Sequence, residues 1–180
     1  VVSGGGWGVG DSAGAVAEAA TLPRTTVVVV TGHNNALDAR LTHAYARDEC
    51  VRVLGFTDTM PMLLAAADVL VHTTGGVTCL EALTVGCPIV AYGAPGGHAP
   101  ALARAMAKLD VAVHAEDRNA LRETLLSPRA APAAEEHASA AEHVLHARVR
   151  TKPTSRHSRL AVASVVVASG ILAFVLAGSR

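Results

Sequence analysis

The segment HTTGGVTCLE (residues 72–81) has the residue types and spacing of a nucleotide-binding turn, because two glycines separate an apolar run from a stretch that suits a helix. Thr78 falls in the first turn of the predicted helix, where its hydroxyl and nearby free N–H groups can bind a diphosphate. Glu81 follows about one turn later, and a carboxylate there can accept hydrogen bonds from both hydroxyls of a ribose. A Glu81 that only complements the helix dipole is the alternative, and the residues alone favour neither.

A second candidate is the glycine-rich window near the start of the chain, formed by Gly4, Gly5, Gly6, Gly8 and Gly10. Glycines let backbone N–H groups approach an anion, and a helix that begins just after them adds its dipole. The window fits neither the GxGxxG fingerprint nor the P-loop, since Asp11 stands where a P-loop requires Lys. A phosphate cradle and a simple tight turn are equally good interpretations, and Asp11 or Ser12 is expected to cap the helix.

Several other kinds of site are not indicated. Fifteen basic and fifteen acidic residues cancel, so the charge gives no reason to expect a nucleic-acid partner. Cys50, Cys79 and Cys87 form no CxxC pair and are expected to be free thiols in a reducing compartment. His143 and His146 share a helix face without a third ligand, so no metal site is expected.

The elements that would position these segments follow from the apolar pattern. The run TTVVVVT (residues 25–31) is typical of a strand covered on both faces. Further strands are expected over 51–56, 68–72, 88–92 and 111–114, with helices near 11–21, 36–47, 60–66, 77–86, 98–108 and 117–126. This alternation predicts an α/β fold with a doubly wound parallel sheet, in which ligands bind outside the carboxyl ends of the strands. Both glycine-rich segments lie at such ends.

The chain changes character after residue 128, so residues 1–128 are expected to form the domain and 129–159 an Ala-rich helix and basic linker. Residues 160–178 (LAVASVVVASGILAFVLAG) carry no charge, and at about 1.5 Å per residue they just span a bilayer core of roughly 30 Å. They predict a C-terminal transmembrane helix, with a buried core helix as the alternative. Because the basic residues precede the span, the chain is expected in the cell membrane with its domain in the cytoplasm.

The run LGFTDTMPMLLAAADVLVHTTGGVTCLEALTVGCPIVAYGAPGGHA resembles the C-terminal domain of family 28 glycosyltransferases, which have the two-domain GT-B fold. The likeness extends from Val1 to about Leu126 and rests on landmarks in a fixed order, from the glycine-rich loop through Gly-Gly-x-Thr-x-x-Glu-Ala to a Pro-Gly loop. The family includes the transferase that forms lipid II and the diacylglycerol glycosyltransferases. The chain is therefore expected to be one Rossmann-like half of such an enzyme.

The resemblance implies a donor site for a UDP-sugar. Glu81 matches the carboxylate that holds the ribose, while Gly75, Gly76 and Thr78 match the diphosphate loop. Gly55 and Phe56 match the segment that faces uracil, and His33 and Asn34 match the end of a strand beside the donor. The loop at the interdomain cleft is matched by Ser3, Gly4, Gly5 and Gly6. The loop that recognises the donor sugar is matched by Gly96, Gly97 and His98. No cofactor and no metal are implied.

The resulting expectation is inverting transfer of a hexose or N-acetylhexosamine from a UDP-sugar to a lipid-linked acceptor at the cytoplasmic membrane face. The family's catalytic base and acceptor site lie in an N-terminal domain, so a partner domain or partner chain is expected to complete the enzyme. The sequence opens inside a predicted strand, as expected of a fragment, and the Gly97-His98-Ala99 run lacks the family's usual polar residues after the glycine. A UDP-sugar epimerase-like enzyme and a non-catalytic, membrane-tethered nucleotide-sugar-binding module are the alternatives.

Overall fold

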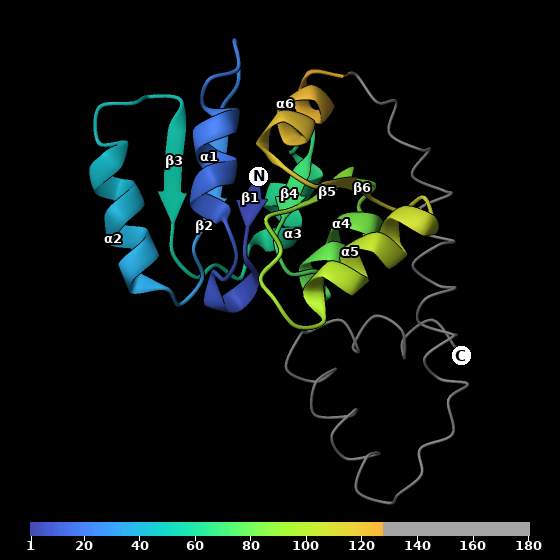
Figure 1. Ribbon diagram of the computed structural model, residues 1–180. Helices are drawn as coiled ribbons and strands as arrows, with labels where there is room; N and C mark the ends of the chain where they lie inside the picture. The colour runs from blue at the N-terminus through green and yellow to red at the C-terminus, as the bar shows by residue number, and fades with distance from the viewer. Residues whose placement is uncertain (128–180) are drawn as a thin grey trace, which may run out of the picture. The chain divides into compact units, whose positions relative to one another are not determined.

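The computed structural model describes residues 1–127, which form a six-stranded sheet in the order β3-β2-β1-β4-β5-β6 (Figure 1). Every neighbouring pair of strands is parallel. The strands are β1 (Val2–Ser3), β2 (Val27–Val30), β3 (Val51–Leu54), β4 (Leu70–His72), β5 (Ile89–Tyr92) and β6 (Val113–Ala115). The predicted doubly wound parallel sheet is confirmed. The strands are one to three residues shorter than the apolar runs from which they were predicted.

Helices alternate with the strands and cover both faces of the sheet. They are α1 (Ser12–Ala19), α2 (Asn35–Ala44), α3 (Met60–Ala65), α4 (Val77–Thr84), α5 (Ala99–Lys108) and α6 (Arg118–Leu126), with a short 3-10 turn, η1, at Gly5–Trp7. One apolar core joins the sheet to α1, α2 and α6, and a second joins its other face to α3, α4 and α5. All six predicted helices are therefore present.

Strand β2 shows why these short apolar runs become strands. Neighbouring side chains of a strand point to opposite faces, so Val27 and Val29 pack in the first core while Val30 packs in the second. A strand covered on both faces has no polar positions to alternate with, and β-branched valine suits its extended backbone. The run of four valines is thus explained by burial on two sides.

The order of the strands determines where a ligand can bind. From β1 the chain proceeds outward to β2 and β3, whereas from β4 it proceeds in the opposite direction to β5 and β6. The loops that leave β1 and β4 therefore lead to α1 and α4 on opposite faces of the sheet, and such a switch point is where ligands bind in open α/β sheets. Both glycine-rich segments begin at this point.

Within residues 1–127 no helix is long and apolar enough to cross a membrane. The predicted transmembrane helix at 160–178, and the Ala-rich helix and basic linker at 129–159, lie outside the described residues.

Candidate functional site

The turn after β4 is shaped by a buried histidine. His72 is only 1% exposed, and its Nδ1 accepts hydrogen bonds from the backbone N–H groups of Thr74 at 3.0 Å and Gly75 at 2.7 Å. An imidazole nitrogen that accepts carries no proton, so the ring is neutral and Nε2 holds its hydrogen. Burial lowers the pKa of His72 to about 4, in agreement with a neutral ring. The N–H groups of Thr74 and Gly75 are therefore occupied and are not the ones offered to a ligand.

Helix α4 presents its own free N–H groups directly after this turn. Gly76 is the N-cap residue, with φ 99° and ψ −147°, and no side chain caps the helix. Among residues 1–127, no backbone acceptor pairs with the N–H groups of Gly76, Val77 or Thr78. A Cβ added at Gly76 would meet no atom within 4 Å, so the backbone faces open space. Free donors beside the positive end of a helix dipole form a site for an anion.

Glu81 lies on α4 one turn beyond Thr78 and is half-buried. Its carboxylate forms no hydrogen bond or ion pair with any group in the described part of the chain, and burial raises its pKa. A half-buried carboxylate without a partner is costly unless a ligand supplies donors. Glu81 can accept two hydroxyls of one sugar ring, which is the role predicted for it.

The glycine-rich window faces the turn after β4. A Cβ built on Gly5, whose φ is +71°, would lie 3.4 Å from the Thr74 hydroxyl, while one on Gly6 would meet nothing within 4 Å. Ser3 is fully buried, and its hydroxyl accepts from the Gly5 N–H group at 3.2 Å. In the structure Ser3 thus shapes the loop, and the Cα of Gly6 faces open space.

The segment after β2 holds the same loop from its other side. The His33 N–H group donates to the Gly6 carbonyl at 2.8 Å, and the Asn34 side-chain amide donates to the Gly8 carbonyl at 3.1 Å. The Asn34 side-chain oxygen accepts from the Leu37 N–H group at 3.0 Å and so caps α2. His33 and Asn34 are predicted donor-binding residues, and the bonds they make here position the glycine-rich loop.

Three aromatic rings from three loops gather beside it. The His33 and Phe56 rings stack with centroids 4.4 Å apart, and the Trp7 ring lies 5.8 Å from His33. Trp7 is 74% exposed and Phe56 62% exposed, so both offer ring surface to solvent. Gly55, just before Phe56, is partly buried. Trp7 is not among the predicted site residues, although an aromatic residue inside a glycine-rich loop is a signal for one.

The loop after β5 is open in its middle. A Cβ added at Gly96 or Gly97 would meet no atom within 4 Å, and His98 is exposed at the N-cap position of α5 without a capping bond from its side chain. Gly75, in contrast, lies so close to α5 that a Cβ there would collide with the Leu102 side chain. The turn after β4 and the start of α5 are therefore packed directly together.

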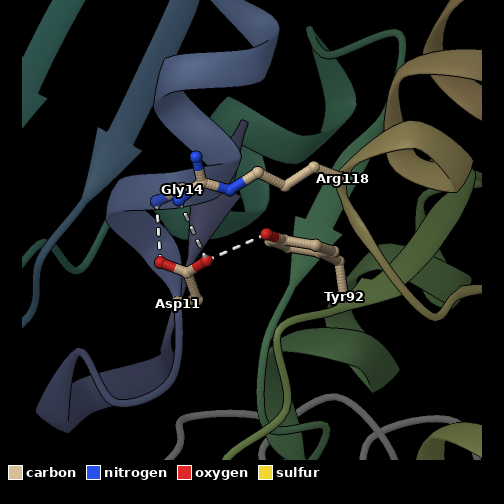
Figure 2. A network of polar contacts seen from close by, with 4 residues as sticks. All are labelled: Asp11, Gly14, Tyr92 and Arg118. Atoms are coloured by element: carbon tan, nitrogen blue, oxygen red, sulfur yellow. Dashed lines mark hydrogen bonds and ion pairs between the residues drawn. The ribbon is translucent and has the colours of Figure 1, made fainter.

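Asp11 connects this edge of the sheet to β5 and α6 (Figure 2). Its carboxylate accepts from the Gly14 N–H group at 2.8 Å, which caps α1, and from the Tyr92 hydroxyl at 2.8 Å. The Arg118 guanidinium lies 3.9 Å away, and both side chains of this pair are well exposed. Burial and the bond to Asp11 raise the pKa of Tyr92, so its phenol remains a donor. Asp11 and Ser12 were the two candidates for the cap of this helix, and the structure shows that Asp11 is the N-cap residue.

A sequence model of the family "Glycosyl transferases group 1" matches residues 11–127. The chain belongs to this family. The processive diacylglycerol β-glucosyltransferase of Bacillus subtilis (strain 168) is 34% identical over 67 residues, a match that covers 37% of this chain and 18% of that enzyme. This agrees with the resemblance to diacylglycerol glycosyltransferases, and the chain spans about a fifth of the length of that relative.

Two solved glycosyltransferases have the same fold as this group 1 chain. The glycosyltransferase of kitacinnamycin matches with a TM-score of 0.57 and 23% identity, over 81% of this chain and 38% of its own. Glycosyltransferase VinC in complex with dTDP matches with a TM-score of 0.55 and 21% identity, over 78% and 36%. The architecture is therefore that of one domain of a GT-B glycosyltransferase.

In this member of the group 1 family the loops that carry the predicted donor residues all leave the carboxyl ends of the sheet. The N–H groups of Gly76, Val77 and Thr78 and the Glu81 carboxylate have no partner among residues 1–127, whereas Ser3, His33 and Asn34 form hydrogen bonds that shape the glycine-rich loop. No cluster of His, Cys, Asp or Glu within residues 1–127 could hold a metal ion, and the three cysteines are free thiols.

Proposed function

We propose that this chain is the donor-binding domain of a UDP-sugar-dependent hexosyltransferase that acts on a lipid or lipid-linked acceptor. The observation that carries the proposal is the pairing of an uncapped α4 N-terminus with Glu81 one turn later at the switch point of the sheet. The N–H groups accept the diphosphate, and the carboxylate accepts the ribose hydroxyls. A nucleoside diphosphate offers both groups in one molecule.

In this scheme the chemistry at the donor is departure of UDP from the anomeric carbon. Negative charge develops on the diphosphate as that bond breaks, and the free N–H groups of α4 and the Thr78 hydroxyl are placed to stabilise it. The acceptor hydroxyl attacks from the opposite face of the sugar, with inversion, after a base removes its proton. That base is assigned to a second domain or partner chain, and the scheme invokes no cofactor or resident metal.

A lipid acceptor is supported by the relative in Bacillus subtilis, which is a diacylglycerol glucosyltransferase, and by the uncharged residues 160–178 with their basic flank. We place the domain at the cytoplasmic face of the cell membrane on the positive-inside rule. A chain ending at residue 159 should then leave the membrane fraction that retains the 180-residue chain. Equal fractionation of the two chains would overturn this placement.

Titration of the full chain with UDP, UDP-glucose, UDP-N-acetylglucosamine and NAD tests the donor assignment. Saturable binding of UDP and of one UDP-sugar, with no binding of NAD, is the expected result. Absence of UDP binding would remove the proposal. Glycosyl transfer to diacylglycerol by this chain alone would refute the requirement for a second domain, and UDP binding without transfer until that domain is added would support it.

A further inference from the structure

The network around Asp11 fixes the beginning of the loop that follows β5. The Asp11 N–H group donates to the Gly93 carbonyl at 2.9 Å. The Asp11 carboxylate accepts from the hydroxyl of Tyr92, the last residue of β5 (Figure 2). Asp11, which follows the glycine-rich window, thus binds the two consecutive residues Tyr92 and Gly93 at the end of β5. The loop at residues 93–98 cannot shift at its start without breaking these bonds.

The backbone around Asp11 is packed too closely to allow such a shift. A Cβ built on Gly93 would lie 2.8 Å from the Asp11 Cβ, and one on Gly14 would lie 2.6 Å from the Asp11 Cγ. Gly10 is equally confined, because a Cβ there would lie 2.8 Å from the Gly93 carbonyl oxygen. Three glycines therefore let the backbone close tightly around one carboxylate-bearing residue.

The other end of the loop is fixed by different contacts. Residues 93–98 lead into α5, whose Leu102 side chain packs on Gly75 and whose Ala99 and Ala103 line a small pocket with His72. Between the two fixed ends, Gly96 and Gly97 face open space. The loop therefore has anchored ends and an accessible middle.

We infer that Asp11, acting through Tyr92 and Gly93, is the positioning residue that sets where the 93–98 loop meets the donor sugar. The inference rests on the proposed function, in which this loop contacts the sugar while α4 contacts the UDP. Asp11 also caps α1, so a purely structural role must be separated from positioning. The two roles use different atoms: Oδ1 accepts from Gly14, and Oδ2 accepts from Tyr92.

Two variants of the full chain separate these roles. Tyr92→Phe removes only the hydroxyl that reaches Asp11. Asp11→Ser keeps a residue that caps helices as well as Asp does, but its side chain is too short to reach Tyr92. Tyr45→Phe is the matched control, because the Tyr45 hydroxyl has no hydrogen-bond partner among residues 1–127 and its ring packs against the same core.

The first measurement needs no ligand. Hydrogen exchange of the residue 11 amide, which donates to the Gly93 carbonyl, should accelerate about tenfold in Tyr92→Phe and Asp11→Ser, the loss expected for one hydrogen bond to a charged group. The hydrogen-bonded amides of Thr73, Thr74 and Gly75 should change by less than about twofold in these variants, and the residue 11 amide should change as little in the Tyr45→Phe control. Unchanged exchange of the residue 11 amide in both variants would overturn the inference, whether or not the chain binds UDP.

The second measurement compares UDP with UDP-glucose. Positioning predicts that both variants lose about tenfold in affinity for UDP-glucose and less than about twofold for UDP, because only the sugar touches the loop. Equal losses for the two ligands would show a general structural effect and contradict positioning. If the wild-type chain bound neither ligand, the proposed function would fail, and the exchange result alone would decide whether Asp11 holds the loop.

Discussion

Gly10 lies so close to Thr73 that a Cβ on the glycine would stand 2.6 Å from the threonine Cβ and 2.7 Å from its hydroxyl oxygen. The Thr73 hydroxyl also donates to the carbonyl of Val9. The glycine-rich loop after β1 and the turn after β4 are therefore one packed unit. The two loops at the switch point are thus held against each other before any ligand binds.

This packing predicts that Gly10→Ala is strongly destabilising. The substitution puts a methyl group against Thr73 at a φ of +87°, and it should lower the free energy of unfolding by about 2–4 kcal/mol. Gly6→Ala is the matched control, since its Cβ would meet no atom within 4 Å. Chemical denaturation of both variants checks this; equal stability of Gly10→Ala and Gly6→Ala would contradict the packing.

Glu81 should discriminate ribose from deoxyribose. If its carboxylate accepts the two ribose hydroxyls, dUDP should bind the wild-type chain about tenfold more weakly than UDP, because one hydrogen bond to a charged group is lost. In Glu81→Ala the affinity for UDP should fall by about 10- to 100-fold and the difference between UDP and dUDP should vanish. Calorimetric titration measures all four affinities. Glu123→Ala, an exposed carboxylate on α6, should behave as wild type.

Stability should decrease as the pH falls below about 6.5. The pKa of His72 is lowered from 6.5 to about 4 in the folded chain, so the folded state binds fewer protons than the unfolded state in this window. The stabilisation is complete above pH 6.5 and is lost progressively toward pH 4, by about 3 kcal/mol in total. Unfolding free energies measured across this range test the sign.

His72→Asn identifies the group responsible. An asparagine side-chain oxygen can accept from N–H groups two and three residues onward, as the His72 Nδ1 does here, and it does not titrate. The variant should stay folded with a flatter pH dependence between 6.5 and 4. A pH profile identical to that of the wild type would assign the effect to another group.

Trp7 is the single tryptophan of the chain and should report on ligand binding. Its ring is 74% exposed and lies near His33, which stacks on Phe56 in the segment predicted to face uracil. Saturating UDP should shield the indole, reducing acrylamide quenching and shifting the emission to shorter wavelength. Quenching that is unchanged at a UDP concentration known to saturate would place the nucleotide away from Trp7. Trp7→Phe should remove the signal and serves as the blank.

The order of strands and helices was predictable because each is encoded locally. The four valines of β2 indicate burial on both faces, and Gly75 and Gly76 mark where β4 must end and α4 begin. Glu81 could be named because its spacing from Thr78 follows from the helical repeat. Parallel strands then bring the ends of distant segments to one edge without further information.

Contacts between loops were not predictable from spacing. The bond from Tyr92 to Asp11 joins residues 81 positions apart, and the His33–Phe56 stack joins loops of different strands. His72 was missed for another reason: its two backbone bonds are local, but Asn and Asp are the usual residues for such turns. An imidazole in that role becomes evident only once its burial is known.

The central position of β1 has a consequence for synthesis on the ribosome. β1 pairs with β2 on one side, but its other partner is β4, where Val2 lies opposite Val71. A nascent chain that has released only β1 to β3 therefore displays an open strand edge of unpaired N–H and C=O groups in what becomes the middle of the sheet. The interval between emergence of residue 54 and emergence of residue 72 from the ribosome is thus when the open edge of β1 is exposed to strand pairing with other chains.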